Sequence, residues 1–422
     1  MSIKNAELRE YEKILLDILS DNLFGTGRKA DLDENSINAL WGEAYAQAVT
    51  LMAFHNSDYK KVKKEQIDYI RSKLNQTLSD NAKVDFEHVR ICSIMKKAGI
   101  PCTILKGFAS ALYYPDPLMR SMGDVDFLVD TDDFEAASRV LAENGYNPTG
   151  KRHDVHDVYV GKVCRCEMHF QPSGIPEGKA GVKIRKYLSG ILEDSQTVQT
   201  ELGEITVPST FHHGLIILLH MCHHLTGDGL GLRHLCDWAV FLDKIGEKAF
   251  LETFEKAVKD IGLWDFAKIM TFISCKYLGL SGMDWAKDAD QKLADYILID
   301  IIIGGNFGQK KADRSHESLL ISSKNEKKVS MLRQFFISAN SIVYKNWKAA
   351  RKLKFLLPFG WIFFGGRYLI RSILGKRPKV RPKKVAKEAS ERIDIYSRLN
   401  LFENQKVTER QSDSYGNKKE KE

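Results

Sequence analysis

The sequence predicts an α+β fold in which a small β-sheet lies between helical regions at both ends of the chain. Apolar positions in residues 1–98 recur every three or four residues, as in helices. Residues 99–208 mix short β-rich runs with helices and glycine turns, and after residue 208 helical spacing returns. We therefore expect a helical N-terminal region (1–98), a core (99–208), a helical domain (209–305), a basic and apolar helical C-terminal segment (306–403) and a disordered tail (404–422).

Helical periodicity supports the regions that flank the core. In the N-terminal region it runs through YEKILLDILSDNLF, ALWGEAYAQAVTLMAF, YIRSKLNQTL and FEHVRICSIMKKAG. Beyond Pro208 it runs through STFHHGLIILLHMCHHL, LRHLCDWAVFLDKIG, AFLETFEKAVKDIG, DFAKIMTFISCKYLG and DADQKLADYILIDII. The alternation of apolar and polar residues that is typical of a strand is lacking in these segments, so we expect the sheet within residues 99–208.

The core alternates strands and helices. PCTILKG is a β-rich run that ends at Gly107 and leads into the helical FASALYY. A second strand, SMGDVDFLVD, precedes the amphipathic helix TDDFEAASRVLAENGY, in which Thr131 is a good N-cap and Gly145 a good C-terminal stop. VHDVYVGK and VCRCEMHFQ are expected to be strands joined by a turn at Gly161.

Composition excludes several classes of protein. Of 422 residues, 43% are hydrophobic and 28% charged, which excludes a disordered chain, and ten prolines with thirty glycines exclude a collagen-like one. Seven cysteines without a close framework argue against a disulfide-stapled secreted module. The N-terminus lacks the apolar stretch of a signal peptide, so we expect a cytoplasmic protein.

The net charge of +8 comes from one C-terminal stretch. Tyr344 to Val385 holds thirteen Lys and Arg and no acid, which leaves 50 basic against 55 acidic residues, or −5, elsewhere. The same stretch contains FLLPFGWIFFGG, an apolar run too short and too interrupted to be a transmembrane segment. Two interpretations stay open: a terminal helix packed on the domain with solvated basic ends, or attachment to an anionic membrane surface. The basic residues alone would also suit RNA.

Acidic residues in the core point to a metal site. Asp124 and Asp126 are two apart on a predicted strand, so both side chains leave one face, with α-carbons about 6.6 Å apart. Glu167 and His169 alternate in the same way in CRCEMHF. Pairing within one sheet could gather the three carboxylates around two Mg²⁺ ions, about 3.5–4 Å apart. Exposed acids at a sheet edge, and a half-buried strand histidine, are the alternatives.

Lys106 and Gly107 leave a strand and enter a helix. A lysine beside the free N–H groups of a helix N-terminus suits a phosphate chain, and Gly107 would let the backbone approach the ligand. The spacing is not that of a Walker loop, and an ordinary strand-to-helix turn with a solvent-facing lysine is the alternative.

Three blocks in order carry a resemblance to a known family. ILKGFASALYYPDPLMRSMGDVDFLV, CEMHF and LLHMCHHLTGDGLGLRHLCDWAVFL resemble the bacterial uncharacterised nucleotidyltransferase family of the polymerase-beta-like superfamily. The likeness runs from about Lys83 to about Lys244 and more loosely through LLPFGWIFFGGRYL. It implies a small mixed β-sheet nucleotidyltransferase core flanked by helices.

The resemblance also assigns roles to residues. Asp124 and Asp126 match the Mg²⁺ ligands, Glu167 the third carboxylate, and Lys106 with Gly107 the place that holds the nucleotide phosphates. The reaction implied is attack by the hydroxyl of an acceptor on the α-phosphate of a nucleoside triphosphate, with pyrophosphate leaving. Glu167 would hold a metal or accept the proton of the nucleophile.

Two further residues near this motif are candidates for nucleotide binding. Ser110 follows the turn, and Arg120 precedes the aspartate pair and could reach a phosphate. Many members have Gly-Ser or Gly-Gly at the turn, whereas Phe108 follows the glycine here. That departure motivates an alternative, a nucleotide-binding or scaffolding protein without turnover. A toxin-like enzyme that modifies RNA is a third possibility, motivated by the basic segment.

One predicted helix is rich in histidine. His220 and His224 are four residues apart and share a face, with Arg233 and Asp237 beyond a glycine-rich turn. Zinc is disfavoured, because the metalloprotease pattern and the cysteine spacing of a zinc finger are both missing. We expect these four residues to contact the nucleotide or the acceptor, and histidines that fill polar gaps in a helical interface are the alternative. The sequence does not name the base, the acceptor or the oligomeric state.

Overall fold

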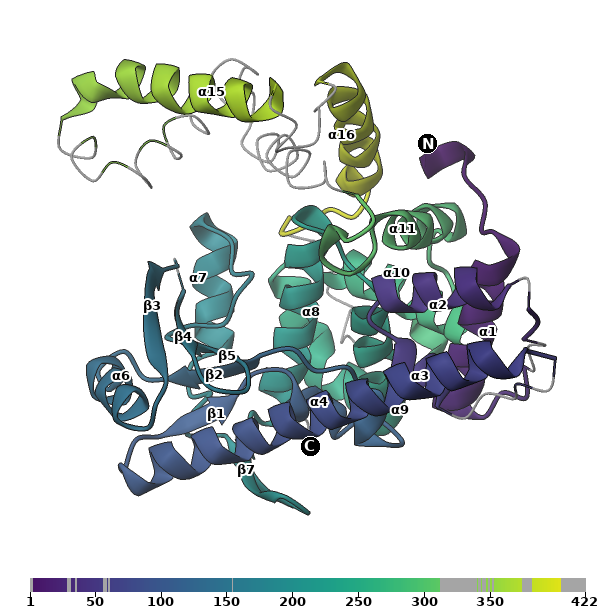
Figure 1. Ribbon diagram of the computed structural model, residues 1–422, viewed down its shortest axis with the longest axis horizontal. Helices are drawn as coiled ribbons and strands as arrows, with labels where there is room; N and C mark the ends of the chain where they lie inside the picture. Colours follow the sequence, from purple (N-terminus) through teal and green to yellow (C-terminus); the bar gives the residue numbers. More distant parts are fainter. Residues whose placement is uncertain are drawn as a thin grey trace, which may run out of the picture.

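The computed structural model describes residues 3–28, 32–34, 36–55, 59, 61–153, 155–311, 340, 343, 347, 350, 353–373 and 382–403. Helices precede the sheet, as predicted. They are α1 (Glu10–Phe24), α2 (Ile37–Ala46), α3 (Thr50–Phe54) and α4 (Lys64–Lys97). The two helical patterns predicted after residue 68 are one continuous helix, α4, which runs beneath the sheet in Figure 1.

A five-stranded mixed sheet forms the core, as the resemblance implied. Its order is β1-β2-β5-β4-β3, with β2 and β5 parallel and the other neighbours antiparallel. The strands are β1 (Cys102–Ile104), β2 (Val125–Val129), β3 (Asn147–Arg152), β4 (His156–Val160) and β5 (Arg165–His169). A separate ribbon pairs β6 (Gln196–Thr200) with β7 (Gly203–Val207). β3, β6 and β7 were not predicted.

Helices within and after the core complete the fold. In the core they are α5 (Phe108–Ala111), α6 (Phe134–Glu143) and α7 (Gly178–Tyr187). Beyond it follow α8 (Thr210–Thr226), α9 (Leu232–Asp260), α10 (Trp264–Leu278) and α11 (Gln291–Gly304). In Figure 1, α8 lies between the sheet and the helices α10 and α11. None of the helices among the described residues has both the length and the apolar character needed to cross a bilayer.

The strand β2 lies between two hydrophobic cores. Val125, Phe127 and Val129 belong to the core that α4 and α6 close against the sheet, whereas Leu128 belongs to the larger core of the helical body. Because side chains alternate across a strand, residue 126 must face the helical body as Leu128 does. The two-residue period therefore directs Asp126 toward the space between the sheet and α8.

Two glycine-rich loops fit closely together beside α8. A Cβ atom on Gly229 would lie 2.8 Å from the backbone N of Gly308, and one on Gly231 would lie 2.7 Å from Cα of Asn306. The backbone N–H of Phe307 donates to the carbonyl of Gly229 at 3.1 Å. Glycine thus allows the loop after α8 to contact the loop after α11, although these loops are far apart in the sequence.

The C-terminal segment returns to the body through α16 (Pro382–Ser397). Arg392 donates through Nε to Asp300 of α11 at 2.8 Å, the hydroxyl of Tyr396 donates to the same carboxylate, and all three residues are buried. Lys311 and Glu388 form an ion pair at 2.7 Å. Between these anchors lie η5 (Lys354–Leu356) and α15 (Leu357–Ile373), and α15 is apart from the sheet and the helical body in Figure 1. The predicted tail lies outside the described residues.

Candidate active site

Three carboxylates meet where β2 and β5 run side by side. The parallel register places Asp126 opposite Glu167, and Asp124 directly precedes β2. All three side chains line one pocket of about 350 Å³. The sequence pattern predicted this meeting, and the parallel register produces it.

Of the three carboxylates, Asp126 makes the closest contacts with neighbouring charged or polar side chains. Its Oδ1 lies 2.9 Å from Nζ of Lys106 and 3.0 Å from Nε2 of His169. Burial opposes ionisation of this carboxyl, but the lysine charge and the histidine outweigh it and lower the pKa of Asp126 well below its ordinary value. Burial likewise opposes a charge on His169, but its hydrogen bonds to Asp126 and Glu167 raise its pKa. Asp126 is therefore ionised at neutral pH.

Asp124 behaves differently from its neighbour. Asp124 is exposed toward the pocket. Protein groups nevertheless surround its carboxyl, and this burial together with the charge of Asp126 raises the pKa of Asp124 to about 6. Two neighbouring carboxylates repel each other, so a nearby cation would stabilise the ionised form of Asp124. Oxygen donors of this kind suit Mg²⁺, so Asp124, Asp126 and Glu167 fit the ion implied by the sequence.

Two histidines of the sheet border Glu167. Nε2 of His156 lies 3.5 Å from its Oε2, and Nε2 of His169 lies 3.6 Å from the same oxygen. Burial, with a smaller effect from the charge of His169, lowers the pKa of His156 to about 4, so His156 is neutral at pH 7. Its Nδ1 is buried and has no hydrogen-bond partner within the part of the chain that the structure describes. The alternation in CRCEMHF indicated His169, whereas no sequence pattern indicated His156.

Gly107 shapes the turn that holds Lys106. Its φ is +62°, and a Cβ atom there would lie 2.5 Å from Nε2 of His88. The His88 ring is fixed on α4, because its Nδ1–H donates to the carbonyl of Val84 at 2.8 Å and its Nε2 accepts from the backbone N–H of Phe108 at 3.5 Å. Burial lowers the pKa of His88 to about 4. A neutral, fully buried histidine thus supports the turn.

The helix after this turn contributes less than expected. α5 has four residues, so it has little of the dipole that a longer helix would direct at a phosphate. Ser110 on α5 is buried, with Oγ 3.5 Å from Nε2 of His213, and it does not line the pocket. A phosphate in this pocket would therefore be bound by side-chain cations more than by this helix.

Arg120 and Asp237 bind each other. Two guanidinium nitrogens of Arg120 donate to the two carboxylate oxygens of Asp237, each at 2.8 Å, and the hydroxyl of Tyr114 donates to the same carboxylate at 2.7 Å. Burial opposes the charge on Arg120, but Asp237 outweighs it and raises the pKa of the guanidinium. Arg120 lines the pocket, whereas Asp237 stands behind it and fixes its orientation.

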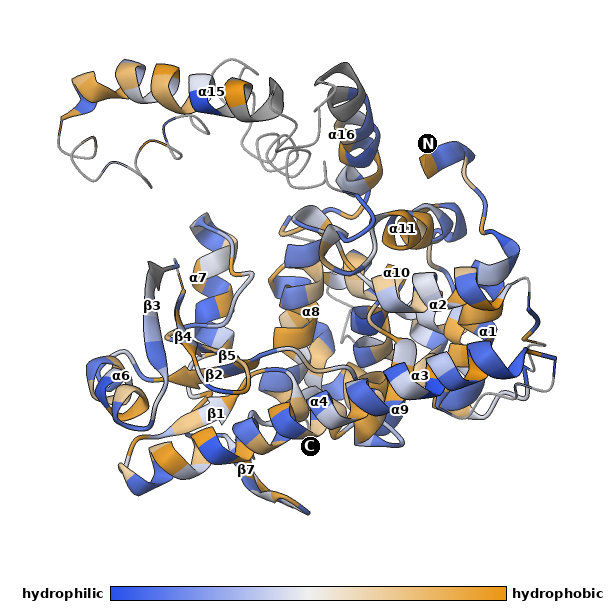
Figure 2. Cartoon of the chain, viewed as in Figure 1, coloured by the Kyte–Doolittle hydropathy of each residue, from blue (hydrophilic) through white to orange (hydrophobic). Residues whose placement is uncertain are grey.

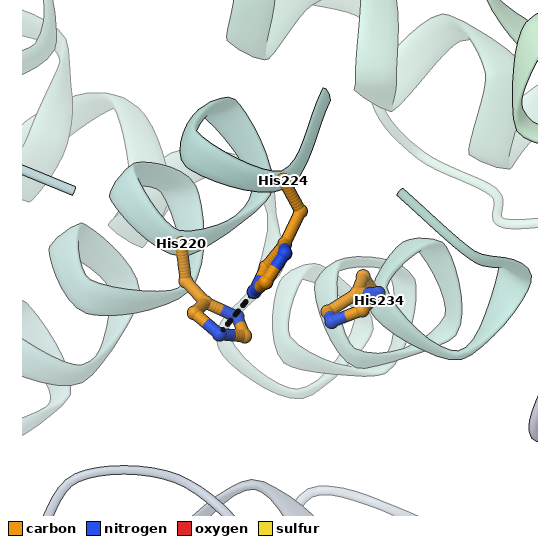
Figure 3. Close-up of side chains that lie close together, drawn as sticks. All are labelled: His220, His224 and His234. Carbon is orange, nitrogen blue, oxygen red and sulfur yellow. Dashed lines mark hydrogen bonds between the residues drawn. The ribbon is translucent and has the colours of Figure 1, made fainter. Parts of the chain in front are cut away.

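Three histidines cluster on the helical wall of the pocket (Figure 3). His220 and His224 extend from α8 and His234 from the first turn of α9, and their ligand nitrogens lie within 4.8 Å of one another. Lys106 directs its ammonium at Nε2 of His220 at 3.4 Å, and Nε2 of His224 lies 2.9 Å from the same atom. A lysine can only donate, so His220 accepts through Nε2 and His224 donates to it.

The hydrogen-bond directions argue against a metal in this cluster. Gly231 donates its N–H to Nδ1 of His234 at 3.3 Å, which leaves the proton of that ring on Nε2. Burial, helped by the charges of Lys106 and Arg233, lowers the pKa values of these three histidines well below their ordinary value. Nδ1 of His224 and Nε2 of His234 are buried without partners among the described residues. The three imidazoles are therefore neutral, and the hydrogen bond from Gly231 leaves Nε2 of His234 protonated, so that nitrogen is not a metal ligand in this arrangement.

One aromatic side chain that was not predicted from the sequence, Phe307, forms part of the pocket wall. Phe307 has a left-handed backbone with φ +52°, is 45% exposed, and lies beside His224 and His234 at centroid distances of 4.8 and 5.6 Å. Arg233 lies over its ring at 5.6 Å and donates to the carbonyl of Ser121 at 3.2 Å. A strained backbone at a non-glycine residue is typical of a functional position.

The structure brings most of the predicted site residues together. Nine of them line the pocket: Lys106, Gly107, Arg120, Asp124, Asp126, Glu167, His220, His224 and Arg233. Ser110 and Asp237 lie behind it, next to a small cavity of about 10 Å³ that is also bordered by His234.

Comparisons with known proteins bear on this site. No curated protein matches the chain significantly. A solved structure titled "Structure of tRNA-processing enzyme complex 3" is 13% identical and aligns over 74% of this chain and 100% of that one, but its TM-score of 0.19 is too low to relate the folds. A family model described as "Uncharacterised nucleotidyltransferase" matches residues 33–279, which include all three carboxylates and the histidine-rich helix. The chain therefore belongs to this nucleotidyltransferase family.

Proposed function

We propose that the protein is a Mg²⁺-dependent nucleotidyltransferase that transfers a nucleoside monophosphate from a nucleoside triphosphate to a hydroxyl acceptor and releases pyrophosphate. One observation carries the proposal. Asp126 and Glu167 are register partners on parallel strands, and together with Asp124 and Lys106, which contacts Asp126, they line a single pocket. Membership of the family supports the same reaction class.

Asp124, Asp126 and Glu167 would hold the magnesium. When bound, the ion would neutralise charge on the triphosphate and orient it for in-line displacement. The three carboxylates supply only oxygen donors, and Asp126 is ionised at neutral pH because Lys106 and His169 stabilise its charge. Two histidine rings, on β4 and β5, border the carboxylate of Glu167.

Lys106, Arg120 and Arg233 would bind the phosphates. Nζ of Lys106 lies between Asp126 and His220, at 2.9 and 3.4 Å, so a small rotation of a long side chain could bring it to a phosphate oxygen. The orientation of Arg120 is fixed by Asp237, which reduces the entropy lost when it binds a phosphate. As an alternative to holding the metal, Glu167 would accept the proton of the attacking hydroxyl.

The nucleobase would stack on Phe307. Its exposed ring is in the wall that His224 and Arg233 also form, on the helical side of the pocket, and the carboxylates are on the sheet side. The unpartnered Nδ1 of His224 offers a buried acceptor next to this ring. An aromatic plate beside a hydrogen-bond acceptor suits a heterocycle that carries an amino or imino group.

A direct assay tests the reaction. Each of the four ribonucleoside triphosphates, labelled at the α-phosphate, is incubated with Mg²⁺, the full chain and a panel of sugars, polyols and RNA, and pyrophosphate release and label transfer are measured. Asp126→Asn should abolish both, and Asp132→Asn, an exposed acid beyond the same strand, should abolish neither. Equal pyrophosphate release from Asp126→Asn and the wild type would contradict the proposal. Tight triphosphate binding by calorimetry with no transfer to any acceptor would favour the non-catalytic nucleotide-binding alternative.

A further inference from the structure

The helix α15 and the turn before it concentrate exposed apolar side chains. Five large residues here, all between 52% and 74% exposed, are Phe355, Phe359, Ile362, Phe363 and Ile370. Their spacing of four, three, one and seven residues puts them within about 100° of one another around a helix. They form a continuous apolar stripe, which we call the α15 stripe. In Figure 2 much of α15 has the colour of apolar residues.

The opposite side of α15 is already occupied by the protein. A Cβ atom on Gly360 would lie 2.5 Å from Val343, the indole N–H of Trp361 donates to Oδ1 of Asn340 at 3.0 Å, and Phe364 lies 5.6 Å from Trp347. These three positions face away from the α15 stripe on the helical circle. Phe363, at the edge of the stripe, also lies 5.7 Å from Trp347, yet it remains 52% exposed. Among the described residues, the chain thus packs one side of the helix and leaves most of the α15 stripe exposed, whereas a helix packed on the domain would bury it.

Charge restricts what could cover the α15 stripe. Between Tyr344 and Val385 the sequence has thirteen Lys and Arg and no acid, and Arg367 is exposed on the helix beside the stripe. A second copy of the helix would bring like charges together. RNA would satisfy the charge but would leave aliphatic side chains such as Ile362 and Ile370 in water, because these do not stack on bases.

We propose that α15 binds in the plane of a membrane rich in anionic lipid, with the α15 stripe at the boundary between headgroups and acyl chains. Lipid burial accounts for the apolar residues and the anionic surface for the basic ones. The 17 residues of α15 extend about 25 Å, and Arg367 lies within them. That length and that charge suit a helix that lies in the interface.

Vesicle flotation with the full chain tests the proposal. Vesicles of pure phosphatidylcholine are compared with vesicles that contain about one third phosphatidylglycerol, at low and high salt. We expect flotation with the anionic vesicles, weaker flotation at high salt, and little with the neutral ones. Phe359→Ser with Ile362→Ser should reduce partitioning by at least about tenfold, and Arg367→Glu should reduce it less. Val182→Ser, on α7 and 66% exposed, is the matched control and should leave it unchanged.

Three outcomes would overturn the proposal. The first is equal flotation of the wild type and the Phe359→Ser, Ile362→Ser variant, provided that both show the same thermal unfolding. The second is wild-type self-association by sedimentation, lost in that variant, without vesicle binding, which would assign the α15 stripe to a second copy. The third is salt-dependent binding of an RNA homopolymer, retained in that variant, without vesicle binding, which would assign the segment to RNA.

Discussion

Substituting alanine for Gly107 would introduce a Cβ atom 2.5 Å from Nε2 of His88. An ordinary contact begins at 3.4 Å, so about 0.9 Å of separation would have to be found. The His88 ring cannot easily provide it, because it is fully buried and hydrogen-bonded to the carbonyl of Val84 at 2.8 Å. The backbone cannot easily provide it either, since φ at residue 107 is +62° and side chains other than glycine are strained there.

The expected loss in the free energy of unfolding has two parts. A strained backbone with positive φ at a non-glycine residue costs about 1–3 kcal/mol, and overpacking of a buried site costs about 1–3 kcal/mol. Gly107→Ala should therefore lower the free energy of unfolding by about 2–6 kcal/mol. Triphosphate binding should weaken as well, because the turn positions Lys106.

Two control variants distinguish the cost of the strained backbone from the cost of overpacking. Gly99→Ala has a similar φ of +71° with nothing within 4 Å of the added Cβ, so it should lose only the backbone part. His88→Ala removes the ring that clashes, so the double variant with Gly107→Ala should be more stable than additivity predicts by about 1–3 kcal/mol. Urea unfolding of the four variants and the wild type measures these differences. Additive losses in the double variant, or a Gly107→Ala loss no larger than that of Gly99→Ala, would refute the steric reasoning.

Three further substitutions probe the site and a buried acid of α4, Asp85, outside it. Asp237→Asn leaves the buried guanidinium of Arg120 with a neutral partner and should cost about 3 kcal/mol in thermal unfolding; a loss below 1 kcal/mol would show that the pair is dispensable. Burial raises the pKa of Asp85 to about 6, above its unfolded value, so its stabilising effect is present at low pH and lost as the pH rises through 6. Asp85→Asn should therefore exceed the wild type in stability by about 1–3 kcal/mol at pH 7 and by little near pH 4, and a gap independent of pH would contradict this. Phe307→Ala should weaken triphosphate binding in calorimetry by about 1–3 kcal/mol, whereas Phe307→Trp should retain it; equal affinities would mean that the base binds elsewhere.

The carboxylates on the sheet side of the site could be predicted from the sequence, because the alternation of side chains between the two faces of a strand depends only on neighbouring residues. Asp124 and Asp126 share a face whatever strand lies beside them, and Glu167 was recognised as an acid within an apolar run. The parallel register that sets Asp126 opposite Glu167 is a tertiary property and needed the structure. β3 was missed because NPTGKR contains a proline, a glycine and two charges, which oppose a strand by propensity.

The helical side of the site depends on contacts that no local pattern contains. Arg120 and Asp237 were both expected to bind nucleotide, and their mutual ion pair depends on the packing of α9 against the core. His88 is on the buried face of α4, where a periodicity analysis counts it as a polar residue. Phe307 belongs to a loop after α11, beyond the residues that the family model matches. Its glycine-rich surroundings, GGNFG, were a signal for close backbone approach that could have directed attention to it.

The ion pair between Lys311 and Glu388 joins the two ends of the chain segment between them, so forming this contact closes a loop. Closing a loop costs conformational entropy that grows only with the logarithm of its length, so halving or doubling this loop would change the free energy of folding by about 0.6 kcal/mol. Arg392 and Asp300 hold the returning end of the loop to the body independently of that length. Insertions and deletions between the anchors should therefore alter the reach of α15 while leaving the stability of the sheet and the helical body almost unchanged.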